Sequence, residues 1–256
     1  MKRTAKKGKT SLNLIITVTG FLLMPLIWLV LKSVFQITDR YFPSFTGVYN
    51  ALFDIEPNIL WHFISTASRF IIGFLLGTTV GILLGLFISK YSWLFDLLMP
   101  SIQATRAVPA IAIVPFFLLW FGFSEIGKYI LVVVGTAFNI AVATYQIVKT
   151  VPEKHSIMFQ SFGLKSEDFI LKYGLPRVAE QILPTLRFSL SAAIGLIVVS
   201  ELLGSQIGLG YLIQSAKSNY ASHVIFLATI FLAILNVSAD WSLRYVWSKV
   251  VYWRQI

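Results

Sequence analysis

The sequence contains no cysteine, and charged side chains are scarce. The lack of cysteine excludes disulfides and metal sites built on thiolates. Charged residues supply 12% of the 256 residues, whereas a soluble chain typically carries about a quarter. Apolar residues supply 57%, and no polar stretch is long enough to fold as a soluble domain. The composition therefore predicts a polytopic membrane protein.

Patterns typical of metal binding or catalysis are also missing. His62, His155 and His223 lie far apart, without the spacing of metal ligands, so we expect no metal site. The sequence shows no carboxylate pair and no nucleophile placed beside a base. We therefore expect that the chain is not an enzyme, and a membrane enzyme is the weaker alternative.

Six apolar stretches are long enough to cross a bilayer, which takes about twenty residues of helix. They run approximately over Leu12–Phe35, Leu60–Ser89, Leu94–Gly122, Tyr129–Val148, Ile182–Leu203 and Val224–Val246. The first exceeds the apolar region of a secretory signal and lacks a small-residue cleavage site, so it is expected to be retained. The sequence thus predicts an all-α fold with about six transmembrane helices.

Lysine and arginine predict the orientation of these helices. If the basic N-terminal tail is cytoplasmic, the inside segments hold fourteen of these residues, and the outside segments hold only Arg40, Lys128 and Lys217. Both termini are then expected in the cytoplasm. The net charge of +10 is explained by this topology and by contact with anionic membrane lipid, and we expect no nucleic-acid partner.

The third stretch contains Pro100, Pro109 and Pro115, each of which removes a backbone donor. A broken helix at membrane depth is tolerated only where protein or a water-filled cavity satisfies the backbone. The segment "RAVPAIAIVP", which begins at Arg106, is therefore the best local candidate for lining a path. Because the stretch is unusually long, its first turns, Leu94–Ala104, are expected to run near the inner surface.

Small residues mark two other places. The second stretch carries a glycine every four residues, a spacing that lets another helix approach closely. These are Gly73, Gly77, Gly81 and Gly85. The contact either moves during function or is ordinary packing. The glycine-rich segment Gly204–His223 lies outside, either as a loop with a short helix near a gate or as a plain connection.

The segment "GFSEIGK", Gly122 to Lys128, fits the first seven positions of a phosphate-binding loop. The next position should be serine or threonine, and here it is Tyr129. The segment also joins two spans on the outer face, with no preceding strand. We therefore expect no nucleotide site and no cofactor in this chain.

Ionisable residues within spans are costly, so each is a functional candidate. Arg69, Arg106, Glu201 and Asp240 lie inside spans, and Arg187 lies near the inner surface. The arginines would suit an anionic solute at a path or gate. Alternatively, these residues form structural ion pairs, such as Arg69 with Glu201. The candidates for a translocation path or gate are Arg69, Arg106, Pro109 and Glu201.

The cytoplasmic segment "SFGLKSEDFILKYGLP", Ser161 to Pro176, predicts a short soluble helix. Ser166 is a good N-cap, and the two acids that follow it favour a first turn. Gly174 is expected in the left-handed conformation that ends a helix, and Pro176 is expected to block continuation. Two turns of helix are unstable alone in water, so this helix docks on a partner or lies on the membrane surface.

These residues resemble the "EAA" loop of permease subunits of bacterial ATP-binding-cassette (ABC) importers. Gly163 matches the loop's most regular glycine, Phe169 matches an apolar helix position, and Leu175–Pro176 matches its leucine–proline pair. The positions of the E-A-A triplet instead hold Ile157, Met158 and Phe159.

Three further stretches resemble the nitrate, sulfonate, taurine and bicarbonate branch of the binding-protein-dependent transport permeases. They are "STASRFIIGFLLG" from Ser65, "RAVPAIAIVPFFLLWFG" from Arg106 and "SELLGSQIGLGYLI" from Ser200. The branch also includes permeases for thiamine and riboflavin precursors. The resemblance covers nearly all of the chain from about Leu60.

The resemblance implies a type I ABC importer permease fold in the bacterial cell membrane. Residues 1–59 would form the tail, first span and external loop, and residues 60–256 would form the core with a cytoplasmic coupling loop at 149–181. Expected partners are a second permease subunit, usually identical, two cytoplasmic ATPases that bind ATP and magnesium, and an extracytoplasmic solute-binding protein. The residues expected to couple to the ATPase are Phe162, Gly163, Leu164, Lys165, Ser166, Glu167, Asp168, Phe169, Lys172 and Pro176.

The expected solute is a small anion such as nitrate, a sulfonate, taurine or bicarbonate. An aromatic vitamin precursor is the close alternative. A stand-alone secondary transporter is a further one, although the sequence shows no inverted repeat of the kind such transporters carry.

Overall fold

The computed structural model describes residues 19–20, 23, 25–150, 158, 161 and 170–255, and within them it contains helices and no strand. A helix satisfies its own backbone groups, which lipid cannot do, so apolar segments of this length fold as helices. In chain order these are Pro25–Phe35, α2 (Phe45–Asp54), α3 (Ile59–Lys90), α4 (Ser92–Ala107), α5 (Ala110–Phe121), α6 (Glu125–Lys149), the π-helical turn η1 (Ile170–Gly174), α9 (Leu175–Gln181), α10 (Leu183–Gly204), α11 (Leu209–Ser218), α12 (Ser222–Val250) and the 3₁₀ turn η2 (Tyr252–Gln255).

Four helices, α3, α6, α10 and α12, are long and apolar enough to cross a membrane. The pair α4 and α5 makes a fifth span if it is counted as one, and the two helices are bent by 100° at their break. The expected first span, Leu12–Phe35, is described mainly over its last part, Pro25–Phe35. The all-α, multi-pass prediction is confirmed.

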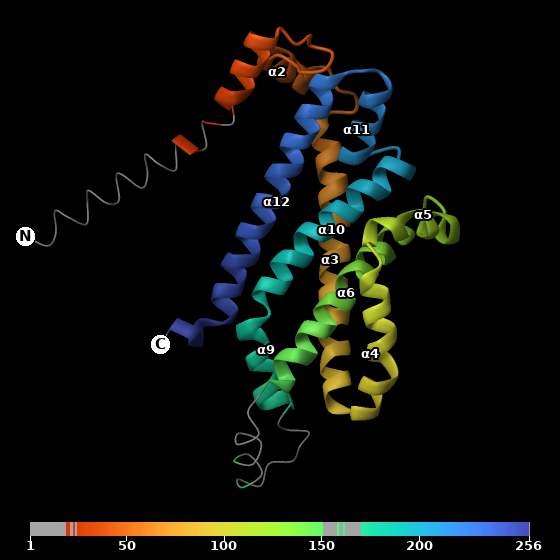
Figure 1. Ribbon diagram of the computed structural model, residues 1–256, viewed down its shortest axis with the longest axis vertical. Helices are drawn as coiled ribbons and strands as arrows, with labels where there is room; N and C mark the ends of the chain where they lie inside the picture. The colour runs from red at the N-terminus through yellow and green to blue at the C-terminus, as the bar shows by residue number, and fades with distance from the viewer. Residues whose placement is uncertain are drawn as a thin grey trace, which may run out of the picture.

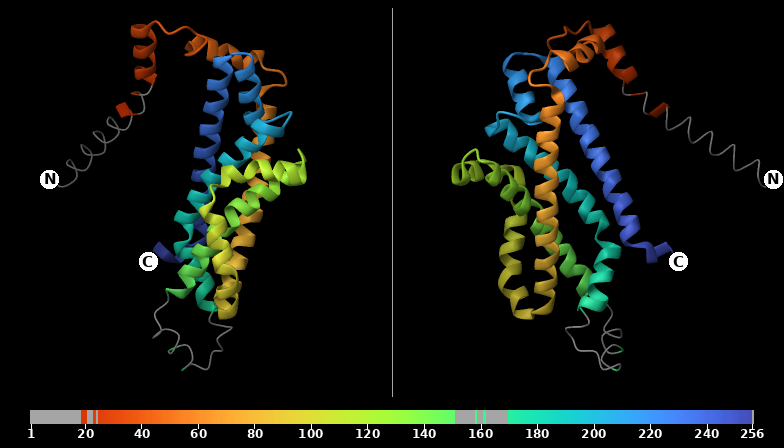
Figure 2. Two further views of the ribbon diagram at one scale, coloured as in Figure 1. Left: turned by 45° about the vertical axis from the view of Figure 1, so that its right-hand side comes forward. Right: turned by 180° about the vertical axis from the view of Figure 1, so that it is seen from behind.

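The spans form an elongated bundle with two distinct ends (Figure 1). At one end α2 and α11 lie over the start of α3, and at the other α9 lies near the turn between α3 and α4 (Figures 1 and 2). We call these the α11 end and the α9 end. Lys90 and Lys149 finish α3 and α6 at the α9 end, whereas Lys217 lies on α11. This grouping of basic residues by end agrees with the expected topology, and the cytoplasmic placement of the α9 end stays a prediction.

The central contact of the bundle joins α3 to α6 through the glycine ridge. A β-carbon added at Gly77 would lie 2.0 Å from Thr136 Oγ1, and one at Gly85 would lie 2.5 Å from the Ala141 carbonyl oxygen. Larger residues would separate the two backbones. The tight packing predicted from the glycine spacing is therefore present, against α6. Around it, a larger apolar core joins α3, α5, α6 and α10.

The structure corrects two expectations for the third stretch. Leu94–Ala104 does not run across the end of the bundle, because α4 lies beside α3 and α6, where Met99 and Ile102 pack against Ile88 and Val142. Pro100 and Pro115 lie inside α4 and α5 without ending them. Of these three prolines only Pro109 coincides with a break, and the residue before it, Val108, adopts the extended conformation that is favoured before proline.

A further correction concerns the end of the expected cytoplasmic helix. Gly174 has φ −61° and ψ −48°, which is right-handed helix and not the left-handed cap conformation. The chain continues directly into α9, where Pro176 occupies the first turn. Proline is tolerated there because first-turn N–H groups have no intrahelical acceptor. The N-cap at Ser166 lies outside the described residues.

Both expected external segments contain a short helix at the α11 end. Helix α2 lies between the first two spans and begins after Ser44, whose hydroxyl accepts a hydrogen bond from the Gly47 N–H at 3.2 Å. Helix α11 confirms the helical version of the second segment. Nearby, the Lys32 ammonium donates a hydrogen bond to Asp39 and holds the pKa of that carboxyl below its usual value.

Candidate functional site

The break between α4 and α5 opens a cavity of about 550 Å³ in the side of the bundle. Its walls come from the end of α4, the start of α5, and residues near the midpoints of α6 and α10, such as Asn139 and Ala192. The break itself, Val108–Pro109, is exposed on the single chain. The cavity therefore lies at mid-span depth, where irregular backbone cannot face lipid.

Arg106 is the charged side chain that lines this cavity among the described residues. Its Nε donates to Asn139 Oδ1 at 2.8 Å, and its Nη1 donates to Gln103 Oε1 at 3.2 Å. Within the described part of the chain, no carboxylate lies within ion-pair distance of it. The structure thus brings two predicted path residues, Arg106 and Pro109, to one cavity.

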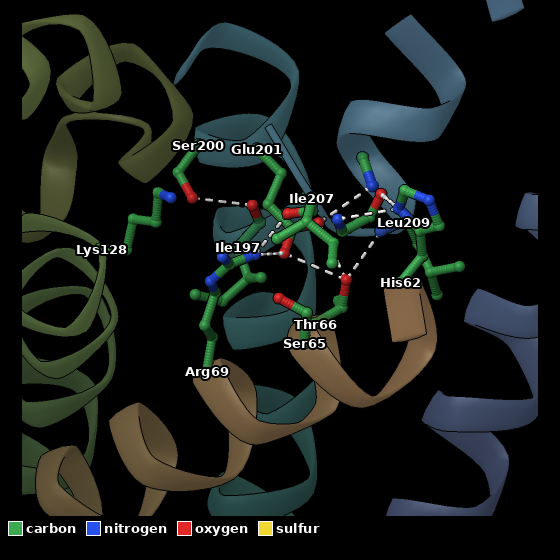
Figure 3. Close-up of polar contacts among 12 residues, drawn as sticks. His62, Ser65, Thr66, Arg69, Lys128, Ile197, Ser200, Glu201, Ile207 and Leu209 are labelled. Carbon is green, nitrogen blue, oxygen red and sulfur yellow. Dashed lines mark hydrogen bonds and ion pairs between the residues drawn. The ribbon is translucent and has the colours of Figure 1, made fainter. Parts of the chain in front are cut away.

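Arg69, another predicted path residue, is buried in an ion cluster towards the α11 end (Figure 3). It binds Glu125 through two hydrogen bonds, Nε to Oε2 at 2.6 Å and Nη2 to Oε1 at 2.7 Å. Its Nη1 lies 2.7 Å from Glu201 Oε1 and also donates to the Ile207 carbonyl at 2.8 Å. The structural alternative, a pair between Arg69 and Glu201, is therefore present and joins α3 to α6 and α10.

Glu201 is fully buried, and further donors satisfy its carboxylate. The Thr66 hydroxyl lies 3.0 and 2.9 Å from its two oxygens, and the Gly210 N–H donates to Oε2 at 2.9 Å. Gly208 passes so close that a β-carbon there would lie 2.4 Å from the Glu201 carboxyl carbon, and its φ is +136°. Only glycine fits this position. The glycines of the α10–α11 turn let the backbone wrap around a buried carboxylate.

Helix α3 also holds this turn through His62 and Thr66. The Gly208 N–H donates to His62 Nδ1 at 3.1 Å, and the Leu209 N–H donates to Thr66 Oγ1 at 2.8 Å (Figure 3). Sequence reasoning assigned no role to either residue. The signal was available, because residues 62, 66 and 69 follow the i, i+4, i+7 spacing of one helix face.

The segment "GFSEIGK" supplies the other half of the cluster. Ser124 caps α6, since its hydroxyl accepts a hydrogen bond from the Gly127 N–H at 3.2 Å. Glu125 binds Arg69, and Lys128 Nζ lies 2.9 Å from Glu125 Oε1. The acid and the lysine of the apparent phosphate loop are thus engaged in ion pairs. Sequence reasoning had left both outside the set of intramembrane charges.

The remaining intramembrane charges pair near the α9 end. Arg187 of α10 binds Asp240 of α12 through Nε at 2.5 Å and Nη2 at 3.1 Å. Arg244 also approaches Asp240, at 3.2 Å. These contacts join the last two spans. Among the described residues, no group of three or more possible metal ligands occurs.

The predicted coupling residues Phe162 to Phe169 lie outside the described residues, whereas Lys172 lies in η1 and Pro176 in α9. The indole groups of Trp247 in α12 and Trp253 in η2 connect α9 to the C-terminal part of the chain. Trp247 Nε1 donates to the Ala179 carbonyl at 2.7 Å, and Trp253 Nε1 donates to Glu180 Oε1 at 2.7 Å. The end of the predicted coupling loop is thereby attached to α12 and to the residues that follow it.

Comparisons with known proteins agree with this architecture. The model of the family "Binding-protein-dependent transport system inner membrane component" matches residues 77–252. SsuC of Bacillus subtilis, a permease protein named for transport of aliphatic sulfonates, is 32% identical over 202 residues, which cover 78% of this chain and 72% of SsuC. ThiX of Halalkalibacterium halodurans, a formylaminopyrimidine transport permease protein, is 26% identical over 237 residues, which cover 92% of this chain and 94% of ThiX.

The fold is also similar to a solved structure, a chain of the MetNI methionine ABC transporter. The TM-score is 0.58 at 17% sequence identity, and the match covers 75% of this chain and 99% of that chain. At this identity the likeness concerns the fold. Together, the family match and the multi-pass fold identify the chain as a member of the binding-protein-dependent transport system inner membrane components, the membrane permease subunits of ABC importers.

Proposed function

We propose that the α4–α5 break, with Arg106 and Pro109, lines the translocation path of this permease. The observation that carries the proposal is an exposed break and an exposed arginine at the depth of the midpoints of α6 and α10. Neither can face hydrocarbon without large cost, so water or protein must cover them. A second copy packed on this side would enclose a polar path between the two chains. We propose a homodimer for this reason.

Arg69 and Glu201 take a different role in this proposal. Both are buried and paired with each other, and Arg69 also pairs with Glu125. They hold α3, α6 and the α10–α11 turn together at the α11 end and do not bind the solute. The support is that the described donors and acceptors around them are already used within the chain.

The partners follow from family membership and are also proposals. Two cytoplasmic ATPases, which hold ATP and magnesium, would dock on loop 149–181, and a solute-binding protein would deliver solute at the α11 end. Movement of the loop would pass through η1 and α9 to α10 and α12, to which α9 is attached. This chain would contribute the path but no hydrolysis.

For the solute we propose a small anion of the sulfonate type. The support is the name of SsuC and the arginine at the cavity. The name of ThiX keeps a pyrimidine precursor as the second candidate. Uptake of radiolabelled sulfonate and pyrimidine into proteoliposomes with the ATPase and binding protein separates the two.

Thiol labelling tests the path, since the chain has no cysteine of its own. Val108→Cys at the break should react with a small hydrophilic thiol reagent in membranes. Val237→Cys on α12 is the matched control, because valine is 46% exposed at the first position and 67% at the second. The cysteine in Val237→Cys should stay unreactive, because we expect this position to face lipid. Equal, negligible labelling at both positions would contradict an aqueous path at the break.

A further inference from the structure

Among the described residues, Arg106 differs from the other intramembrane arginines because no acidic partner lies beside it. Arg69 pairs with Glu125 and Glu201, and Arg187 and Arg244 pair with Asp240. Around Arg106 the described chain offers only two neutral amide oxygens, from Asn139 and Gln103. A guanidinium has five N–H groups, so these bonds leave three for another acceptor. A charge left uncompensated at this depth is costly unless an anion meets it.

Within the part of the chain that the structure describes, no acid is left free at this depth for a second identical chain to supply as that anion. The sequence contains eleven aspartates and glutamates. The three within the long spans, Glu125, Glu201 and Asp240, are already paired with cations. Asp96 lies on the same helix as Arg106 but ten residues away, which is about 15 Å along a helix. The other acids lie at the ends of the bundle or outside the described residues; they are Asp39, Asp54, Glu56, Glu153, Glu167, Asp168 and Glu180.

Apart from Thr105, the remaining walls of the cavity are apolar. They include Ile113, Phe117, Val134, Phe138 and Phe188. The volume of about 550 Å³ lies within the usual range for small-molecule sites, about 300–1,000 Å³. One cationic group among apolar walls suits a molecule with an acidic head and a carbon body. It suits a fully hydrated inorganic oxyanion less, because such an ion gains nothing from apolar contact.

We propose that this cavity binds a small organic anion, with Arg106 as the ligand of its acidic head group. Asn139 and Gln103 hold the guanidinium in position, and the apolar walls contact the carbon body. A sulfonate or carboxylate can accept two parallel N–H bonds from one guanidinium. The inference rests on the proposed function, in which the cavity faces the path, and it narrows the transported class to organic anions.

Binding to the purified full-length chain in lipid nanodiscs tests the proposal directly. The probes are radiolabelled butanesulfonate, with unlabelled inorganic sulfate and butylammonium as competitors. Unlabelled butanesulfonate should compete, and the other two should compete at least about tenfold more weakly. Arg106→Gln should weaken butanesulfonate binding by about tenfold or more, the effect of losing a charge-assisted hydrogen-bond pair.

Two variants control the experiment. Arg106→Lys keeps the charge without the planar fork, so it should restore part of the affinity lost in Arg106→Gln. Arg244→Gln removes an exposed arginine elsewhere and should bind like the unchanged chain. Elution as the same oligomer in size-exclusion chromatography checks that each variant is folded.

The outcomes separate this inference from the importer function. If Arg106→Gln binds butanesulfonate as the unchanged chain does, or if butylammonium competes equally, the anion site is refuted even when ATP-dependent uptake is normal. If binding depends on Arg106 but no ATP-dependent uptake is found with any partner ATPase, the proposed function fails and the site stands.

Discussion

Arg69 shows why a charge can stay in the core of this membrane protein. Two carboxylates and a backbone carbonyl accept its hydrogen bonds, all within 2.6–2.8 Å. Burial of an ion costs several kcal/mol, and this cost is offset only where geometry and hydrogen bonding are good. Glu201 has a comparably complete set of donors. The buried ion pair is therefore stable when both residues are present, and removal of either residue should destabilise the protein.

Removing one member of this cluster should destabilise the whole fold. Arg69→Leu leaves Glu201 buried without its cation, and breaking a buried pair in this way costs about 3–5 kcal/mol. We expect a clearly lower unfolding midpoint for the variant in detergent. The matched control is Arg244→Leu, where the arginine is exposed and Asp240 keeps Arg187. Equal midpoints for the two variants would show that the cluster does not stabilise the protein.

At the scale of elements, the sequence predicted the long spans well and their interruptions poorly. The bounds of α3, α6, α10 and α12 follow from runs of apolar residues. The bend at Pro109 and the continuity at Gly174 depend on packing, because proline and glycine both occur inside helices when neighbours support the backbone. Likewise, the sequence placed Glu125 in a loop. Its ion pair with Arg69 could not be predicted, because the local sequence around Glu125 gives no sign of a partner on another helix.

The contact between α3 and α6 depends on the absence of side chains along the glycine ridge. In Gly81→Ala the added carbon would lie 2.7 Å from the Ala137 carbonyl oxygen, so the helices must separate. Overpacking of this kind costs about 1–3 kcal/mol. The variant should unfold at a lower temperature than Gly195→Ala, where the added carbon meets nothing within 4 Å. A thermal scan of both variants in detergent makes the comparison, and the prediction is wrong if they unfold together.

The attachment of α9 to α12 should matter for coupling more than for folding. Trp247→Phe keeps an aromatic ring but removes the hydrogen bond to Ala179, which contributes about 1 kcal/mol. If α9 passes loop movement to the spans, this variant should retain ATP hydrolysis in the assembled complex but lose much of its uptake. The control, Trp241→Phe, changes an exposed indole on the same helix and should keep both activities. Unchanged uptake per ATP in Trp247→Phe would remove α12 from the coupling route.

At the scale of the whole molecule, the two ends of the bundle differ in charge, and we propose that they differ in function. The sequence predicted this division from its lysines and arginines, and it predicted an arginine at a broken span. It could not predict which charges pair, because Arg69, Glu125 and Glu201 come from three helices and meet only in the folded bundle. In the sequence, Arg106 and Arg69 are both arginines within apolar stretches, and nothing there distinguishes their roles. Their surroundings, not their identity, separate a candidate solute ligand from a structural ion pair.

Labelling from the two sides of the membrane tests the orientation of the molecule. Ser218 on α11 and Thr150 after α6 are both exposed and lie towards opposite ends. With cysteine at one of these positions in the cysteine-free chain, a membrane-impermeant thiol reagent should label Ser218→Cys in intact cells. It should label Thr150→Cys only after permeabilisation, because positively charged segments are generally retained in the cytoplasm and the α9 end carries such residues. The reverse pattern would place the coupling loop outside, away from ATP, and would overturn both the topology and the proposed ATPase contact.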